Sequence, residues 1–350
     1  MTLPGLDRHR QAEFIYTLLD WEGRELRPLT NVTGGTITLS GSSRLRASGS
    51  IDLASTDDGI EWAKNRVRIE YAPSGAPAWG LGVFTLSAPT RTYTEAGSTW
   101  SVELSSLLAL PDADCVERTY TVKAGSNLVN MAASILRETG LNTLSVTPSA
   151  AQASGDIVYD PGKSKLTIAN DLLAAAGYWA AHPDGTGAIH LDPYVRPAAR
   201  GVAYDFREGA RAIHLPEWEY ELDAASVPNK IVLVSEGSQD KPALVGVAMN
   251  EDPSSPYSYP SRGRWVTETQ TGVEAANQES ISSQARRRLI EVSTPSASIT
   301  IQHMPIPLQP NSVAGFLSQG LSTRGVVREI SYALDPTALV KTKLLEVTDL

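Results

Sequence analysis

The sequence has little cysteine and histidine, fewer basic than acidic residues, and no long hydrophobic run. Its single cysteine, Cys115, excludes an internal disulfide and a thiolate zinc site. With 30 basic and 39 acidic residues the net charge is −9, which argues against a nucleic-acid-binding surface built on phosphate contacts. No run approaches about 18 apolar residues, and residues 1–10 lack the apolar stretch of a signal peptide. We therefore expect a soluble, acidic protein that is made in a reducing cytoplasm and has no membrane anchor.

Turn-forming residues, by contrast, are plentiful and are spread along the whole chain. The 350 residues include 27 glycines and 22 prolines, and 41% are hydrophobic, which is enough for packed cores. At roughly 150 residues per domain, the length predicts two to three domains. Up to about residue 110, short segments alternate apolar and polar residues, as strands do. These segments are 36–39, 48–53, 66–71, 82–86 and 100–104. Their close spacing predicts an antiparallel barrel or sandwich.

The pattern changes between residues 111 and 199, where two helices are expected. The first, over 126–139, has one apolar stripe, with Ser126 as N-cap and Gly140 as the left-handed residue after it. The second runs from an N-cap at Ser164 to Gly177. The two stripes are Leu128, Met131, Ala132, Ile135 and Leu136, and then Ile168, Ala169, Leu172 and Leu173. With the hairpin turn predicted at Asp184-Gly185, these helices indicate a small α/β unit.

Residues 200–350 return to strands, with an insertion at about 250–292. The insertion contains a turn-rich loop over 252–263 and a helix over 273–292. The expected strands are 212–215, 218–222, 230–234, 297–301, 328–332 and 341–347. The inward-facing side chains expected in the helix are Ala276, Ile281, Ala285 and Leu289. We thus predict a mainly β chain with α/β elements, divided into a β domain at 1–110, an α/β domain at 111–199 and a second β domain at 200–350.

Few residues combine into a catalytic or metal-binding pattern. The best metal candidate is a group of four potential ligands within eleven residues, His182, Asp184, His190 and Asp192. If the hairpin forms, His190 and Asp192 share one strand face and His182 reaches them across the turn. However, an Asp-Gly pair is already explained by a hairpin turn. We therefore predict no metal site here.

The acidic pairs do not form a catalytic pattern either. Asp57-Asp58 occupies a loop, and Asp112 and Asp114 flank a proline-containing junction. A glycosidase needs two carboxylates opposed across a cleft, with one pKa raised. The three alternating glutamates Glu217, Glu219 and Glu221 repel one another, which is typical of a solvated or lumen-lining face. Cys115 has no histidine near it in sequence, and we expect it to be buried as a small hydrophobe. No catalytic residue and no cofactor-binding residue is predicted, and so no enzyme.

A second class of function is suggested by residues 120–128. This stretch looks like the start of a LysM peptidoglycan-binding motif, but the second half of the motif is missing after Leu141. Binding of peptidoglycan or other wall carbohydrate is therefore the alternative to a purely structural role. A wall hydrolase that uses the 182–192 cluster or an acidic pair is a third, less favoured reading.

The order of several segments carries a family resemblance. They are 80–84 (GLGVF), 165–173 (KLTIANDLL), 227–234 (VPNKIVLV), 252–256 (DPSSP), 261–264 (SRGR) and 285–289 (ARRRL). This series resembles the minor tail proteins of siphophages that infect actinobacteria, specifically the tail-tip (baseplate) hub type. The resemblance covers roughly residues 35–345, and it rests on order and spacing rather than on any single motif.

The resemblance implies a structural virion protein at the distal end of a phage tail. It implies two tube-type antiparallel β-barrels, each decorated by a smaller α/β element. Three chains would present six such barrels, forming a homotrimeric ring that adapts a sixfold tail tube to a threefold tip. The implied partners are a distal tail protein or tail tube above, tip, spike or fibre proteins below, and the tape measure protein in the lumen. Because the chain ends at Leu350, soon after the second β region, any wall-degrading activity is expected on another subunit.

DNA would then pass through the ring without specific binding, which gives the acidity a physical role. An acidic wall repels phosphate. In this hypothesis Glu217, Glu219 and Glu221 face the lumen while Trp218 and Tyr220 pack into the barrel.

Overall fold

A computed structural model describes residues 6, 10–54, 59–95, 97–222, 225–235, 242–273, 278–292 and 297–347. The chain is mainly β with a few helices, which confirms the predicted fold class. It divides into two compact units, one of Met1–Trp218 with Thr300–Leu344 and one of Glu219–Ile299 with Leu345–Leu350. None of the described helices is long and apolar enough to cross a membrane.

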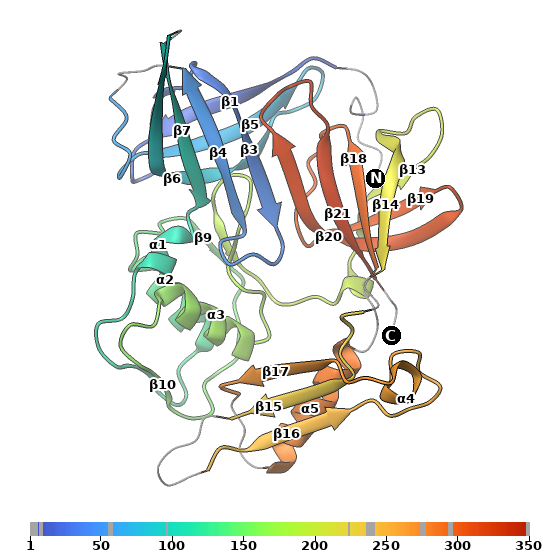
Figure 1. The fold of residues 1–350 in the computed structure, drawn as a ribbon. Helices are drawn as coiled ribbons and strands as arrows, with labels where there is room; N and C mark the ends of the chain where they lie inside the picture. The colour runs from blue at the N-terminus through green and yellow to red at the C-terminus, as the bar shows by residue number, and fades with distance from the viewer. Residues whose placement is uncertain are drawn as a thin grey trace. The chain divides into compact units, whose positions relative to one another are not determined.

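The N-terminal strands of the first unit form an antiparallel series, as the alternating sequence predicts (Figure 1). Along the sheet their order is β3-β4-β7-β6-β5-β1-β2. The strands are β1 (Ala12–Leu19), β2 (Glu25–Pro28), β3 (Val32–Ser40), β4 (Ala47–Ala54), β5 (Arg66–Pro73), β6 (Trp79–Thr94) and β7 (Gly97–Ser106). The inward-facing residues of the alternation, including Ile37, Ile51, Ile69 and Phe84, are fully buried. Burial of these β-branched and aromatic side chains holds the strands together.

The C-terminal strands continue the same sheet. They are β13 (Val202–Arg207), β14 (His214–Leu222), β18 (Ala297–His303), β19 (Val313–Ser318), β20 (Leu321–Ala333) and β21 (Val340–Glu346). Strand β20 pairs antiparallel with β3, placing Glu329 opposite Ser40 and Ala333 opposite Thr36, and so joins both series into one 13-stranded sheet. Strands from both predicted β domains therefore share a sheet. The division into two barrels with boundaries at 110/111 and 199/200 stays a prediction.

The segment between the two strand series is α/β, as expected. Its helices are α1 (Ala109–Ala113), α2 (Leu128–Arg137), α3 (Lys165–Ala175) and the short 3₁₀ turn η1 (Pro197–Ala199). Its strands are β8 (Tyr120–Val122), β9 (Leu144–Val146), β10 (Ile157–Tyr159), β11 (His182–Pro183) and β12 (Ile189–Leu191). Helices α2 and α3 pack side by side (Figure 1). Their apolar stripes share one core with Leu19 and Val83 from the N-terminal strands, which ties this segment to the sheet.

The helix ends show one correct prediction and one error. Ser164 caps α3, and its side chain accepts a hydrogen bond from the Thr167 N–H. The expected N-cap of α2 was Ser126, but the cap is Asn127, whose side chain accepts from the Asn130 N–H. The helix therefore begins one residue later, because an amide oxygen caps as well as a hydroxyl. Gly140 and Gly177 follow the two helices with φ of +85° and +75°, as predicted.

The second unit is a small three-stranded sheet covered by one helix. Strands β16 (Val245–Met249), β15 (Lys230–Val234) and β17 (Thr267–Thr271) pair in that order, and α5 (Gln278–Val292) packs on β15 and β16. Ile281 and Ala285 face inward as predicted, and Leu289 packs against the same core; Ala276 lies outside the described residues. The loop over 252–263 is not a strand, as expected, and it contains the helical turn α4 (Tyr259–Arg262).

Candidate functional site

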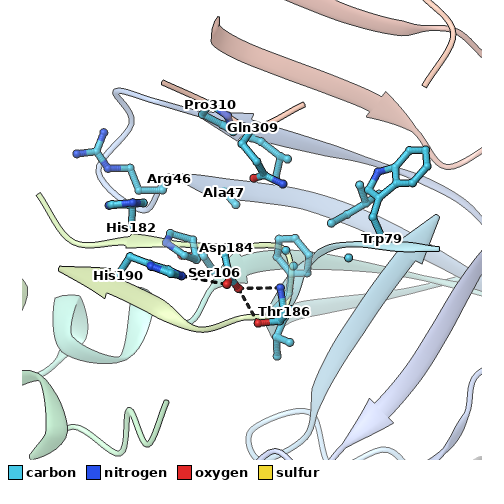
Figure 2. Close-up of a pocket in the computed structure, with 18 of the residues that line it drawn as sticks. Arg46, Ala47, Trp79, Ser106, His182, Asp184, Thr186, His190, Gln309 and Pro310 are labelled. Atoms are coloured by element: carbon cyan, nitrogen blue, oxygen red, sulfur yellow. Dashed lines mark hydrogen bonds and ion pairs between the residues drawn. The ribbon is translucent and has the colours of Figure 1, made fainter. Parts of the chain in front are cut away.

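The first unit contains a cavity of about 610 Å³, which lies between the N-terminal strands, the β11–β12 hairpin and the segment around residue 310 (Figure 2). Leu39, Ala47, Leu81, Val83 and Phe84, which are buried side chains of β3, β4 and β6, form part of its wall. Polar side chains from the hairpin and from the β3–β4 loop complete it. A volume of this size is in the range of small-molecule sites, roughly 300–1,000 Å³.

Three glycines allow the hairpin to reach the sheet. A Cβ added to Gly80 on β6 would lie 1.9 Å from the carbonyl oxygen of Gly185 in the hairpin loop. Further along the loop, Gly187 has φ +86°, and a Cβ there would lie 2.7 Å from the side chain of Val83. Backbone therefore packs directly against backbone at Gly80 and Gly185, and this close approach forms one side of the cavity.

The hairpin loop is organised around the carboxylate of Asp184. Its Oδ1 accepts hydrogen bonds from the Thr186 N–H (2.8 Å), the Thr186 hydroxyl (2.7 Å) and the Ala188 N–H (3.1 Å). Its Oδ2 lies 3.0 Å from Nε2 of His190. Burial raises the pKa of Asp184, but the hydrogen bonds from His190, Thr186 and Ala188 outweigh burial and hold the pKa below its ordinary value. Asp184 is thus an ionised, fully engaged carboxylate at neutral pH.

The four residues of the candidate metal group do come together. His182 lies opposite His190 across the hairpin, with ring centroids 5.7 Å apart, and Nδ1 of His190 lies 3.4 Å from Oδ2 of Asp192. The expectation that His190 and Asp192 share one strand face is therefore confirmed. Nδ1 of His182 is 3.2 Å from the Ala180 carbonyl oxygen, and burial lowers the pKa of His182. Oδ1 of Asp192 accepts from the Thr147 hydroxyl at 2.7 Å.

These groups are directed at one another and at the hairpin rather than at a common centre. In the part of the chain that the structure describes, no group of three or more His, Cys, Asp or Glu side chains is arranged to hold a metal ion. The arrangement is that of a polar network that stiffens one wall of the cavity.

Sequence reasoning missed Arg46, a cavity residue that forms no ion pair with any of the described residues. It lies in the β3–β4 loop with φ +64°, and one of its guanidinium nitrogens donates a hydrogen bond to the Gly41 carbonyl. Burial, followed by repulsion from Arg328, lowers the pKa of Arg46. No local pattern marks this arginine, because its place at the cavity follows from the packing of the hairpin and of the segment near residue 310 against the sheet.

The remaining candidates do not form a site. Asp57 and Asp58 lie outside the described residues. Asp112 is ion-paired with Arg44, and Asp114 with Lys165 at 2.8 Å. Each carboxylate therefore ties the segment before α2 to another element.

Cys115 was expected to be buried, and this is wrong, because the residue is a free and exposed cysteine. Its backbone pairs with Ser164 in an isolated antiparallel bridge. The residue lies at the surface of the α/β segment, although Val116 beside it is buried.

The acidic strand β14 partly follows the sequence hypothesis. Glu217, Glu219 and Glu221 are all exposed, and Trp218 packs edge-on against Phe316 with ring centroids 5.0 Å apart. Tyr220 was expected to pack into a barrel, but 47% of it is exposed, and its hydroxyl bonds to Glu346 at 3.3 Å. Most of this strand is exposed, and His214 is its one buried residue.

No protein-family model and no curated protein matches the sequence. Solved structures do match, over nearly the whole chain. A tail protein from Neisseria meningitidis MC58 is 13% identical with a TM-score of 0.65, and the match covers 96% of this chain and 97% of that one. The 43 kDa tail protein of prophage MuSo2 from Shewanella oneidensis is 14% identical with a TM-score of 0.67, covering 96% and 98%. Prophage tail protein gp18 from Listeria monocytogenes is 12% identical with a TM-score of 0.55, covering 95% and 94%.

These likenesses extend along both chains from end to end, so they concern the whole architecture and not one shared motif. The chain has the fold of phage tail proteins, and the resemblance expected from the order of its segments is confirmed at that level.

Proposed function

We propose that this chain is a structural subunit of a phage tail tip, the hub of the baseplate, and that it acts without enzymatic chemistry. The observation that carries the proposal is the fold match to tail proteins over 96% of this chain and 97% or more of two of those chains. Fold alone does not determine function, since one fold can host several. Here, however, the polar groups of the hairpin contact one another, which also favours a structural role over a catalytic centre.

The proposal extends to assembly. Three chains form a ring, which contacts a distal tail protein or tail tube above and tip, spike or fibre proteins below. The tape measure protein and then DNA pass through its lumen. The exposed carboxylates of β14 and the net charge of −9 support a wall that repels DNA rather than retaining it. The virion, at the distal end of the tail, is the expected location, after synthesis in the host cytoplasm.

Two measurements test this function. Native mass spectrometry of the purified chain should show a species of three times the 37.5 kDa chain mass. Immunogold labelling of virions with antibodies against the chain should place the label at the tail tip. Label on the capsid or along the tail shaft would contradict a tip protein, whereas tip label with only monomer in solution would contradict the stable trimer alone.

Cell-wall binding remains the alternative function. Residues 120–128 run from β8 to the first residue of α2, and no family model matches the sequence. A pull-down on purified cell wall distinguishes the two functions, because a plain hub stays in solution.

A further inference from the structure

Strand β16 is an outer strand of the small sheet in the second unit, because among the described strands it pairs with β15 alone (Figure 1). Its side chains alternate between the two faces of that sheet. Gly246 and Ala248 are buried on the face that α5 covers. Val245, Val247 and Met249 are 46%, 42% and 47% exposed on the other face. Single exposed apolar residues are ordinary, but three on one face of one strand form an apolar patch.

The hydrogen bonds on either side of β16 show which of its residues pair with β15. In an antiparallel pair, every second residue exchanges backbone hydrogen bonds with the neighbouring strand. The Leu244 carbonyl accepts from the Ser235 N–H at 2.9 Å, and the Asn250 N–H donates to the Asn229 carbonyl at 2.8 Å. The register between these two bonds has no shift, so the even-numbered residues over 244–250 are the ones bonded to β15.

The odd-numbered residues of β16 therefore direct their N–H and C=O groups out of the sheet edge. The carbonyl oxygen of Val245 shows this direction, because it accepts a hydrogen bond at 2.8 Å from the side chain of Gln278 at the start of α5. No described residue bonds to the backbone N–H or C=O of Val247 or Met249. Open backbone groups and apolar side chains thus lie along the same stretch of strand.

The two outer strands of the large sheet, β2 and β14, differ from β16 in composition. Charged side chains and prolines on an edge strand discourage the addition of a further strand. Strand β2 has Glu25, Arg27 and Pro28, and β14 has Pro216 and three glutamates. Strand β17, at the other edge of the small sheet, is polar throughout and includes Glu268. Strand β16 (VGVAM) has no charge, no proline and no bulge, so nothing in it opposes pairing.

Helix α5 lies close to β16 and influences which partner fits there. A Cβ added to Gly246 would lie 2.5 Å from the carbonyl oxygen of Ile281 in α5, so glycine is required for this approach. A second copy that paired through its own β16 would bring a second α5 onto the same face, next to the first. A single extended segment brings no helix with it, and the addition of such a segment to an open sheet edge is a recurring mode of peptide recognition.

We propose that β16 is the docking strand for an extended segment of another tail-tip subunit, which pairs antiparallel with it through the backbone groups of Val247 and Met249. Residues at alternate positions of that segment lie beside the apolar patch, and they are uncharged, because a charge there would lose water without gaining a partner. The choice of donor rests on the proposed tail-tip function, whereas the open edge is a property of the isolated chain.

Fluorescence polarisation of a labelled peptide, titrated with the full chain, tests the open edge. The probe alternates threonine and valine, with a lysine at each end and both termini blocked. Its valines match the apolar patch, and antiparallel pairing then places the valine N–H groups opposite β16. Because each hydrogen bond contributes about 1 kcal/mol, N-methylation of the valines should weaken binding at least about tenfold. N-methylation of the threonines, whose N–H groups point away from β16, is the matched control and should leave binding intact.

Val247→Pro is the corresponding change in the chain. Since β15 does not use the Val247 N–H, proline removes no bond of the sheet but blocks the edge. Peptide binding should fall at least about tenfold, as with the methylated probe. Val247→Lys is a second variant, which should weaken binding several-fold. Thr269→Lys is its control, because Thr269 on β17 and Val247 on β16 lie on opposite sides of Val232, and it should leave binding unchanged.

Absence of peptide binding, equal affinity for the plain and valine-methylated probes, or full binding by Val247→Pro would overturn the proposal. If Val247→Pro fails to fold, the comparison of Val247→Lys with Thr269→Lys decides it, and equal loss in both overturns it. Self-association of the full chain in sedimentation velocity, abolished by Val247→Pro or Val247→Lys, would assign the edge to a second copy instead.

Hydrogen exchange tests the donor. The amides over 244–250 should exchange more slowly in purified tails than in the isolated chain. Equal exchange in both would contradict a tail-tip donor, even where the peptide binds. Immunogold label away from the tip would contradict the proposed function but not the open edge, which the peptide titration measures on the chain alone.

Discussion

Gly80 and Gly185 meet backbone to backbone, although 104 residues separate them in the sequence. A Cβ on Gly80 would lie 1.9 Å from the Gly185 carbonyl oxygen, and a Cβ on Gly185 would lie 2.2 Å from that of Gly80. Real Cβ atoms do not approach other atoms so closely, so only glycine fits at either position. This contact seats the β11–β12 hairpin on β6 and shapes the cavity.

The first prediction concerns this contact. Gly80→Ala should lower the free energy of unfolding by about 1–3 kcal/mol, because the methyl group meets backbone that has to move. Urea denaturation followed by circular dichroism measures the change. Gly201→Ala is the control, since nothing lies within 4 Å of a Cβ there. Equal stability of the two variants would show that the hairpin is not seated as described.

The second prediction concerns the start of α3. Ser164→Ala removes the cap of the Thr167 N–H and a 2.9 Å bond from the Arg44 side chain. The loss of an N-cap typically costs about 1 kcal/mol of stability. Chemical denaturation should show a loss of this size, whereas Ser154→Ala, an exposed serine with no such bond, should leave stability unchanged. A loss in both variants would indicate a general effect of removing hydroxyls instead.

The third prediction concerns pH. His303 on β18 is fully buried; its Nδ1 lies 2.7 Å from the Met304 carbonyl oxygen and its Nε2 lies 2.8 Å from the Thr342 hydroxyl. Because a carbonyl only accepts, Nδ1 carries the proton and the Thr342 hydroxyl donates to Nε2. Burial lowers the pKa of His303 from 6.5 to about 4.

The unfolded chain therefore binds a proton at His303 more readily than the folded chain does. The stability contributed by the neutral imidazole is complete above pH 6.5 and declines as the pH falls through the window to about 4. The full decline is about 3 kcal/mol. Unfolding free energies measured across this window should fall steeply for the natural chain and less steeply for His303→Gln. Parallel curves would mean that His303 is not the group responsible.

The fourth prediction concerns the acidic strand. Glu217, Glu219 and Glu221 are exposed, so replacing all three with glutamine should change the free energy of unfolding by no more than about 0.5 kcal/mol per site. Replacing them with lysine should make the assembled ring retain DNA in a gel-shift assay, if they line its lumen. The glutamine variant serves as the control for folding. If the ring of the lysine variant does not retain DNA, these side chains lie on the outer surface.

Much of the fold could be predicted from local patterns. A side chain faces inward or outward with the period of its own strand or helix. This local period explains the alternation over 36–39 and 66–71 and the apolar stripes of α2 and α3. The cap at Ser164 and the left-handed glycines after both helices are equally local. The order of segments was enough to indicate a tail-protein fold, which the solved structures confirm.

Other features arise only where distant segments meet. Nothing near Cys115 in the sequence indicates that its backbone pairs with Ser164 and leaves the residue exposed. Strand β20 pairs with β3, and Gly80 contacts Gly185, although each pair is more than 100 positions apart in the sequence. Arg46 likewise lines a cavity together with residues more than 100 positions away.

The sequence by itself thus determined many of the strands, the three longer helices and an acidic chain of tail-protein type. Tertiary structure alone decided which side chains meet at the cavity, Arg46 among them, because the surroundings of one side chain depend on backbone that comes from elsewhere in the chain.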